Sequence, residues 1–529
     1  MKHNILIIIS TIAIAFTSCS DFLDVKPEKD PSSGTFFATD KDATDAINAC
    51  YWILNQEGTF GRDIFWEQCG AGDDLIYGRN RGEDQNNLAN FTFTGRESSL
   101  RSNWNQFTEY LSKANWVVYN LLRKGELSTV EKNRLGEAYF MRAFCHFYIA
   151  YRHGRADQGV PFDRYEDYDP YEYQIPEQRA SVMINYELII QDLESAVTYL
   201  PFFEEYPNSD WGRAHKAAAW AYMVKVYAYW AQHDASKWAL IPSLVNRIES
   251  EGRRGLLDNY ADVFTIENNW SKEHIWSVNS SGYNYAGSIF PGVVLENKGW
   301  GRYNGWGYFK PTLGLYDEFA SGDLRRNVTI LEYNDEFVFY GETRRFYSTS
   351  DLEAGFQLAK YMEPFVHGAV VDGVGVSDKI SPNGDRPSTD LNLPVIRHAE
   401  MVLFKAEALI MQNSYADAAK ELNRLTSRAG LGDVYTTATL DDLKHERRCE
   451  LAGEFTDRFM DLKRWKEWDK LNAPKIGRKH EDRSNPESPW TPLEIWPSRT
   501  FNPDTDIAFP YNPDEVTKSN GKLKQNPIG

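Results

Sequence analysis

Cysteine and basic residues are both scarce in this sequence. The 529 residues include five cysteines, and no two of them form a CxxC pair, which excludes a disulfide framework or a zinc ribbon as the basis of the fold. Lys and Arg total 58 against 76 Asp and Glu, so the formal net charge is −18. Because an acidic surface repels phosphate backbones, we expect no nucleic-acid partner.

Catalytic motifs are also missing. The ten histidines form no HExxH pattern, and the sequence contains no GxSxG nucleophile elbow. His445 and Cys449 lie four residues apart, as in half of a metal site, but further ligands are lacking and we expect both to pack structurally. Gly373 and Gly375 lack the third glycine of a phosphate-binding loop. We therefore predict a binding protein that is not an enzyme, and we identify no catalytic residue, cofactor or metal ligand.

Only one long hydrophobic run occurs, from residue 5 to residue 16, behind a short basic start. It is too short to span a bilayer, which takes about 20 residues, and it matches the apolar region of a secretory signal peptide. A small residue precedes Cys19, as in bacterial lipoproteins whose cysteine is lipidated; an ordinary signal peptide with an incidental cysteine is the alternative. We predict a signal peptide at 1–18, lipidation at Cys19 and a flexible tether at 19–35.

Helical periodicity dominates much of the remaining chain. Apolar residues recur at helical spacing in pairs of segments joined by short turns, which is the pattern of antiparallel helical hairpins. Tyr415 opens a Tyr-Ala-Asp-Ala sequence after one such turn, and this sequence resembles a tetratricopeptide repeat. The predicted helical segments are 39–54, 104–122, 130–153, 181–199, 214–232, 397–412, 415–428 and 440–468.

The middle of the chain has a different composition. Residues 260–395 are rich in Gly, Asn, Tyr and Trp, with short β-like pieces at 274–278 and 337–340, and repeated prolines predict a loop at 485–515. We predict a mainly α fold, in which tetratricopeptide-like helical hairpins form a scaffold with long ordered loops and a few short β-strands. We expect one domain, 36–529, with a loop-rich insertion at about 260–395 that is well placed to carry function.

Several ordered segments resemble one known family. EAYFMRA at 137–143, ERRCELA at 446–452 and RFMDLKRW at 458–465 are similar to its recurring motifs. Together with residues 19–27, 398–408, 423–431 and 509–527, these segments span essentially the whole mature chain. The sequence therefore resembles the SusD/RagB family of outer-membrane lipoproteins of Bacteroidetes.

The resemblance implies a cell-surface glycan-binding lipoprotein that serves polysaccharide utilisation. Proteins of this kind capture oligosaccharides and deliver them to a SusC-like TonB-dependent transporter in the outer membrane, where a lipid anchor holds them. Asp21 and Asp24 resemble the acidic signal that sends such lipoproteins to the outer face. Some members bind peptides, so peptide loading is the first alternative. A lipoprotein glycoside hydrolase and a scaffold without a small ligand are the others.

Aromatic residues make up 14% of the chain, which is more than a helical core needs. One cluster lies among glycines at 299–309, whereas a buried strand would be richer in Val and Ile. Rings of this kind can pack on the C–H face of a pyranose while Asp, Asn and Arg bind its hydroxyls. Trp306 has the alternative role of anchoring its own loop. The predicted glycan-binding residues are Trp300, Tyr303, Trp306, Tyr283, Tyr285, Trp66, Asp74 and Tyr77.

Charged residues alternate at helical spacing between residues 446 and 464. Glu446 and Glu450 could form the carboxylate pair of a glycoside hydrolase. Alternatively, these carboxylates join the arginines of the same run in a partly buried ion-pair network. Because neighbouring arginines keep carboxylates ionised, whereas a general acid needs a raised pKa, we favour the network.

Overall fold

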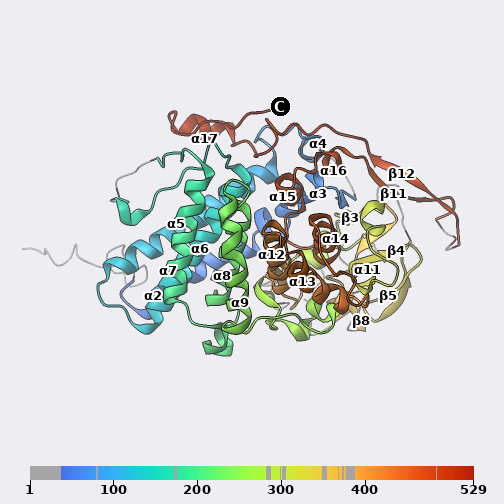
Figure 1. Cartoon of the computed structure of the whole chain (residues 1–529), viewed down its shortest axis with the longest axis horizontal. Helices are drawn as coiled ribbons and strands as arrows, with labels where there is room; N and C mark the ends of the chain where they lie inside the picture. The colour runs from blue at the N-terminus through green and yellow to red at the C-terminus, as the bar shows by residue number, and fades with distance from the viewer. Residues whose placement is uncertain are drawn as a thin grey trace, which may run out of the picture.

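The computed structural model describes residues 37–529 except 79–81, 169, 172–174, 282–287, 298–299, 301–304, 348–353, 367–368, 372–373, 377–387, 484 and 486. The predicted signal peptide, Cys19 and the predicted tether lie outside the described residues. Long helices occupy one side of the molecule and short strands the other (Figure 1). Among the described residues, no helix is both long and apolar enough to cross a membrane.

Helices form the scaffold. The longer helices are α2 (Asp40–Tyr51), α3 (Asp63–Ala71), α4 (Glu83–Asn90), α5 (Ser98–Arg123), α6 (Thr129–His153), α7 (Val182–Tyr199), α8 (Lys216–Trp230), α9 (Ile241–Ser250), α12 (His398–Met411), α13 (Tyr415–Arg428) and α14 (Leu440–Leu451). The shorter ones are α10 (Leu313–Tyr316), α11 (Leu324–Thr329), α15 (Arg458–Arg464), α16 (Trp468–Asn472) and α17 (Pro513–Lys518). The mainly α fold with paired helices is confirmed.

The described strands form small antiparallel pairs rather than one sheet. They are β1 (Leu75–Ile76) with β3 (Lys310–Pro311), β2 (His274–Val278) with β10 (Leu393–Arg397), β4 (Ile330–Glu332) with β7 (Phe356–Leu358), β5 (Glu336–Phe339) with β6 (Glu342–Arg345), β8 (Ala369–Val371) with β9 (Val374–Val376), and β11 (Lys475–His480) with β12 (Trp490–Trp496). Both predicted β-like pieces are strands, since 274–278 is β2 and 337–340 overlaps β5.

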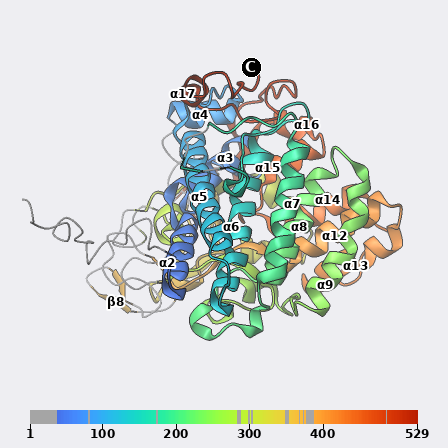
Figure 2. The same ribbon diagram turned by 90° about the vertical axis from the view of Figure 1, so that its left-hand side faces the viewer.

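The α5–α6 hairpin shows why these sequences fold as helices. Ser128 and Glu131 form a capping box at the start of α6, in which each accepts a hydrogen bond of 3.0 Å from the other's backbone N–H. Helix α6 packs between α5 and α7 (Figure 2) and is buried along most of its length. Arg142 on α6 pairs with Asp192 on α7 at 2.8 Å, which joins the two helices.

The charged run belongs to a buried ion-pair network, as predicted, but the arginines that pair with Glu450 come from outside the run. Arg397 donates to Glu450 at 2.8 Å and to Glu273 at 2.8 Å, while Arg428 and Arg325 also pair with Glu450. Burial raises the pKa of Glu450, but the three arginines outweigh burial and hold that pKa at about 2. An ionised, fully paired carboxylate cannot act as the general acid of a glycoside hydrolase.

Two sequence-based boundaries were wrong. The predicted loop at 485–515 contains β12, in which Pro492 lies opposite Arg478; a two-stranded ribbon tolerates proline because each strand has an unpaired edge. The predicted helical segment 440–468 breaks after α14, where Gly453 has φ of +73°. Cys50, Cys145 and Cys449 are buried and unpaired, as expected of core residues.

Candidate functional site

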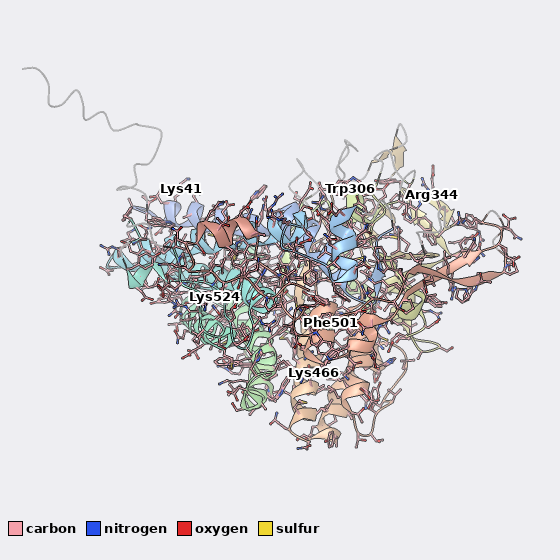
Figure 3. All side chains as sticks on the ribbon, turned by 90° about the horizontal axis from the view of Figure 1, so that it is seen from above. Lys41, Trp306, Arg344, Lys466, Phe501 and Lys524 are labelled. Carbon is pink, nitrogen blue, oxygen red and sulfur yellow. The ribbon has the colours of Figure 1, made fainter. Side chains whose placement is uncertain are left out.

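An aromatic surface lies at the edge of the loop-rich region. Trp306 and Tyr308 are both partly exposed, and their ring centroids are 5.8 Å apart at 56°. Tyr308 in turn packs on Trp66 at 4.6 Å, and Trp66 packs on Tyr77 at 4.8 Å. The rings therefore form a continuous row from the surface to the core. Figure 3 places Trp306 at the edge of the molecule.

Backbone hydrogen bonds fix this surface. The N–H groups of Trp306 and Tyr308 donate to Val293 and Val294 of the helical turn η10 (Phe290–Leu295), at 2.8 and 3.0 Å. Gly307 has φ of +63°, and a Cβ at Gly305 would clash with the backbone of Glu296. The glycines on both sides of Trp306 are thus required by the backbone, and they hold the ring in a defined position.

Arg62 supplies charge and hydrogen-bond donors beside the rings. Its guanidinium lies 5.8 Å from the Trp306 ring centroid, at the junction between η2 (Glu57–Gly61) and α3. It pairs with Asp63 at 2.6 Å and with Glu57 at 3.5 Å, and 29% of its side chain remains exposed. Burial raises the pKa of Asp63, and the adjacent Arg62 opposes that rise. No local pattern could predict that Arg62 lies next to Trp306, because 244 positions separate the two residues.

Three predicted contacts are buried. Trp66, Asp74 and Tyr77 are only 5%, 6% and 2% exposed. The Tyr77 hydroxyl donates to the Trp66 carbonyl at 2.7 Å, and Asp74 accepts from Arg448 at 2.7 Å. Their surfaces are already covered by protein groups, so we correct the prediction of direct glycan contact. In this structure Trp66 packs against Tyr308, Tyr77 packs against Trp66, and Asp74 pairs with Arg448 of α14.

Trp300 belongs to a separate aromatic cluster. Its ring packs on Phe337 at 4.8 Å and on Phe339 at 5.4 Å, and Arg344 donates to its carbonyl at 2.6 Å. Arg344 and Trp306 lie toward the same edge of the molecule in Figure 3. The ring of Trp300 is partly exposed, which leaves it accessible. Tyr283, Tyr285 and Tyr303 lie outside the described residues, so their positions stay predictions.

No group of three or more His, Cys, Asp or Glu side chains that could hold a metal ion occurs within the described part of the chain. The Cys449 thiol lies 3.8 Å from the Glu318 carbonyl, and His445 contacts the Glu318 carboxylate at 2.7 Å. His445 and Cys449 therefore both contact Glu318, the residue that lies beside this part of α14. Their spacing in the sequence could not predict this partner.

Comparison with known proteins gives consistent matches along the chain. Residues 272–528 match a family model described as "SusD family", and residues 21–228 match one described as "Starch-binding associating with outer membrane". A SusD-like protein of Bacteroides ovatus is 26% identical over 498 residues, which cover 88% of this chain and 83% of that protein.

Solved structures show the same fold. Surface glycan-binding protein A from Bacteroides fluxus has a TM-score of 0.71 at 24% identity, covering 92% of this chain and 99% of its own. The corresponding protein from Bacteroides thetaiotaomicron, in complex with laminarihexaose, has a TM-score of 0.69 at 20% identity, covering 92% of this chain and 99% of its own. At these identities the likeness concerns the fold.

Proposed function

Because this chain belongs to the SusD family, we propose that it is a cell-surface lipoprotein that binds oligosaccharides and delivers them to a SusC-like TonB-dependent transporter. The observation that carries the glycan assignment is the partly exposed Trp306–Tyr308 ring pair, with the Arg62 guanidinium beside it. The laminarihexaose bound by a protein of the same fold supports this assignment.

The chemistry of the surface fits a sugar. A pyranose can place its C–H face on one of the rings, while the Arg62 N–H groups and the Glu57 carboxylate lie in position to bind hydroxyls. Covering a ring face contributes about 1–3 kcal/mol by area, before the cost of ordering the ligand. Binding of this strength is weak and reversible, which suits a protein that must release its cargo to a transporter.

Anchoring at the outer membrane is the second part of the proposal. Lipidated Cys19 would hold the body through the 19–35 tether, and two or more acyl chains suffice for stable attachment. The description of the family model that matches residues 21–228 names the outer membrane, which supports this location. Trp300, Tyr303, Tyr283 and Tyr285 remain proposed glycan contacts from the same loop-rich region.

Native affinity electrophoresis tests the function. The chain from residue 20 onward would be run through gels that contain plant, fungal or host polysaccharides. We expect at least one glycan to retard migration, with no release of reducing sugar on incubation. Sugar release would indicate a hydrolase. Migration unchanged by every glycan would contradict glycan binding and favour a peptide cargo, to be tested next with a peptide mixture.

A further inference from the structure

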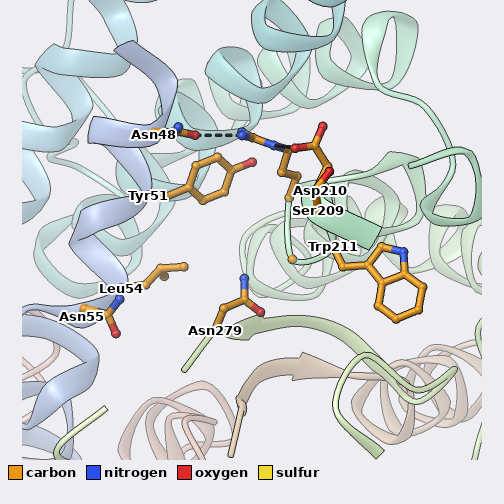
Figure 4. A pocket seen from close by; sticks show the side chains of 10 residues that line it. Asn48, Tyr51, Leu54, Asn55, Ser209, Asp210, Trp211 and Asn279 are labelled. Carbon is orange, nitrogen blue, oxygen red and sulfur yellow. Dashed lines mark hydrogen bonds and ion pairs between the residues drawn. The ribbon is translucent and has the colours of Figure 1, made fainter. Parts of the chain in front are cut away.

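A pocket separate from the Trp306 surface lies where three distant segments meet. Its volume is about 260 Å³, and it is enclosed by the end of α2 with the following turn η1 (Trp52–Asn55), by residues 209–213 before α8, and by Asn279 after β2. Figure 4 shows Asn48 and Tyr51 on one side, Asn279 on the opposite side and Trp211 at the rim. None of the residues described above for the Trp306 surface lines this pocket.

The charges in the pocket are already neutralised. Arg213 pairs with Asp210 at 3.0 Å and with Glu137 at 3.0 Å, while Arg134 also pairs with Asp210 at 3.2 Å. An anionic ligand such as a phosphate or a uronate would have to compete with these carboxylates for the guanidinium groups. The pocket therefore suits an uncharged ligand.

Two side-chain amides, those of Asn48 and Asn279, provide hydrogen-bond donors in the pocket. Asn48 accepts from Arg213 at 2.9 Å through Oδ1, so its N–H groups remain for other partners. Asn279 accepts from the Trp270 indole N–H at 3.0 Å through Oδ1, and Figure 4 shows its nitrogen directed toward the open space. Asn55 also lines the pocket, but its Oδ1 is shielded from solvent and is therefore not available to a ligand. The oxygen of a sugar hydroxyl can accept from such amide donors.

The apolar part of the pocket is held rigidly. The Tyr51 hydroxyl donates to Glu137 at 2.9 Å and accepts from the Ala214 N–H at 2.9 Å. Trp211 contacts Trp270 with centroids 5.9 Å apart, yet 38% of Trp211 is exposed. Gly212 has φ of +97°, and a Cβ there would clash with the Asn279 amide. The Tyr51 and Trp211 rings can therefore contact one face of a small ligand ring, while the neighbouring amides bind groups at its edge. Because these side chains are already held in place, little ordering is needed on binding.

We propose that this pocket is a second carbohydrate site, which takes a single neutral pyranose ring. Its volume lies just below the range of about 300–1,000 Å³ that is usual for ligand pockets, so one sugar unit fits better than a long chain segment. The inference rests on the pocket's own chemistry and stands independently of the Trp306 surface. Two sites on one chain would strengthen attachment to a polysaccharide by avidity.

Saturation-transfer difference NMR tests the proposal on the chain carrying Cys19→Ser, which alters no described residue. The probes are the methyl glycosides of glucose, galactose, mannose and xylose, with glucuronic acid as the charged comparison. We expect transfer to at least one neutral glycoside, reduced about fivefold or more by Trp211→Ala and by Ser209→Trp, which fills the exposed rim. Trp490→Ala is the matched control, because Trp490 is 39% exposed and lies in β12, away from the pocket.

The outcomes separate the two sites. Transfer that survives Trp306→Ala but falls in both pocket variants supports the second site. Transfer that falls only in Trp306→Ala overturns the second site while supporting the proposed function. Absence of transfer to every neutral glycoside, or equal transfer to glucuronic acid, also overturns the proposal. Circular dichroism melting of each variant identifies any that fail to fold. If one of the two pocket variants is unfolded, the result for the other pocket variant tests the proposal.

Discussion

At the scale of single residues, Arg397 is a buried cation with three carboxylate partners. It is 1% exposed and pairs with Glu273, Glu450 and Glu454. Replacing it with Met leaves three buried carboxylates without this cation, and breaking a buried pair in this way typically costs about 3–5 kcal/mol. We expect Arg397→Met to lower the free energy of unfolding by that amount, as measured by urea denaturation.

An exposed arginine provides the control for this prediction. Arg345 pairs with Glu336 at 2.6 Å, but 45% and 58% of the two side chains are exposed. Solvent screening reduces such pairs to about 0–1 kcal/mol, so Arg345→Met should change the free energy of unfolding by no more than that. Equal losses in the two variants would contradict a structural role for the buried network.

The same network predicts a pH dependence. The arginines around Glu450 hold its pKa at about 2 against the burial that would raise it, and the pKa of Glu454 is lowered too. Because these folded-state values lie below the unfolded ones, the stability they contribute is present above about pH 4.5 and is lost as the pH falls toward 2. Urea denaturation at several pH values should show this decline, with a shallower slope in Arg397→Met. A free energy of unfolding that stays unchanged down to about pH 3 would contradict this pH dependence.

At the scale of elements, the Gly305–Tyr308 segment links backbone geometry to binding. A Cβ at Gly305 would clash with the Glu296 backbone, so Gly305→Ala should displace Trp306 from its place on η10. We expect weaker retention of the glycan in affinity gels with little loss of helical content. Gly255→Ala is the control, since a Cβ there meets only Lys272 at 3.9 Å. If Gly305→Ala is retained by the glycan as strongly as the unmodified protein, the Gly305–Tyr308 segment does not contribute to glycan binding.

Regular elements were predictable because their signals are local. The Ser128 cap and the apolar periodicity of α6 lie within the element itself, and the alternation of charges in α14 already indicated a network. Strand β12 was missed because its prolines normally predict loops, and only its pairing with β11 shows that they are tolerated.

The candidate site could be predicted by region but not by residue. Sequence composition identified the glycine-rich aromatic segment, and Trp306 does lie at the surface. It could not show that Trp66 is covered by Tyr308, because these two residues lie more than 200 positions apart in the chain. For the same reason it missed Arg62, which reaches Trp306 only in the folded chain.

At the scale of the whole molecule, the helices form a scaffold and the loop-rich region carries the proposed glycan surface (Figure 1). The matches at 21–228 and 272–528 assign both halves of the chain to one family architecture. In the proposed account, lipidated Cys19 attaches the acidic protein to the outer face of the outer membrane. Weak contacts with the aromatic rings bind oligosaccharides, which are then released to the transporter. The central claim is that Trp306 and Tyr308 bind the glycan.

Isothermal titration calorimetry with the glycan retained in the gels tests this claim most directly. Loss of both ring faces in Trp306→Ala/Tyr308→Ala should raise the dissociation constant about 10- to 100-fold, which corresponds to about 1.4–2.8 kcal/mol. Trp490→Ala, the exposed tryptophan control, should leave it unchanged. An unaltered dissociation constant in the double variant would contradict the assignment of the site.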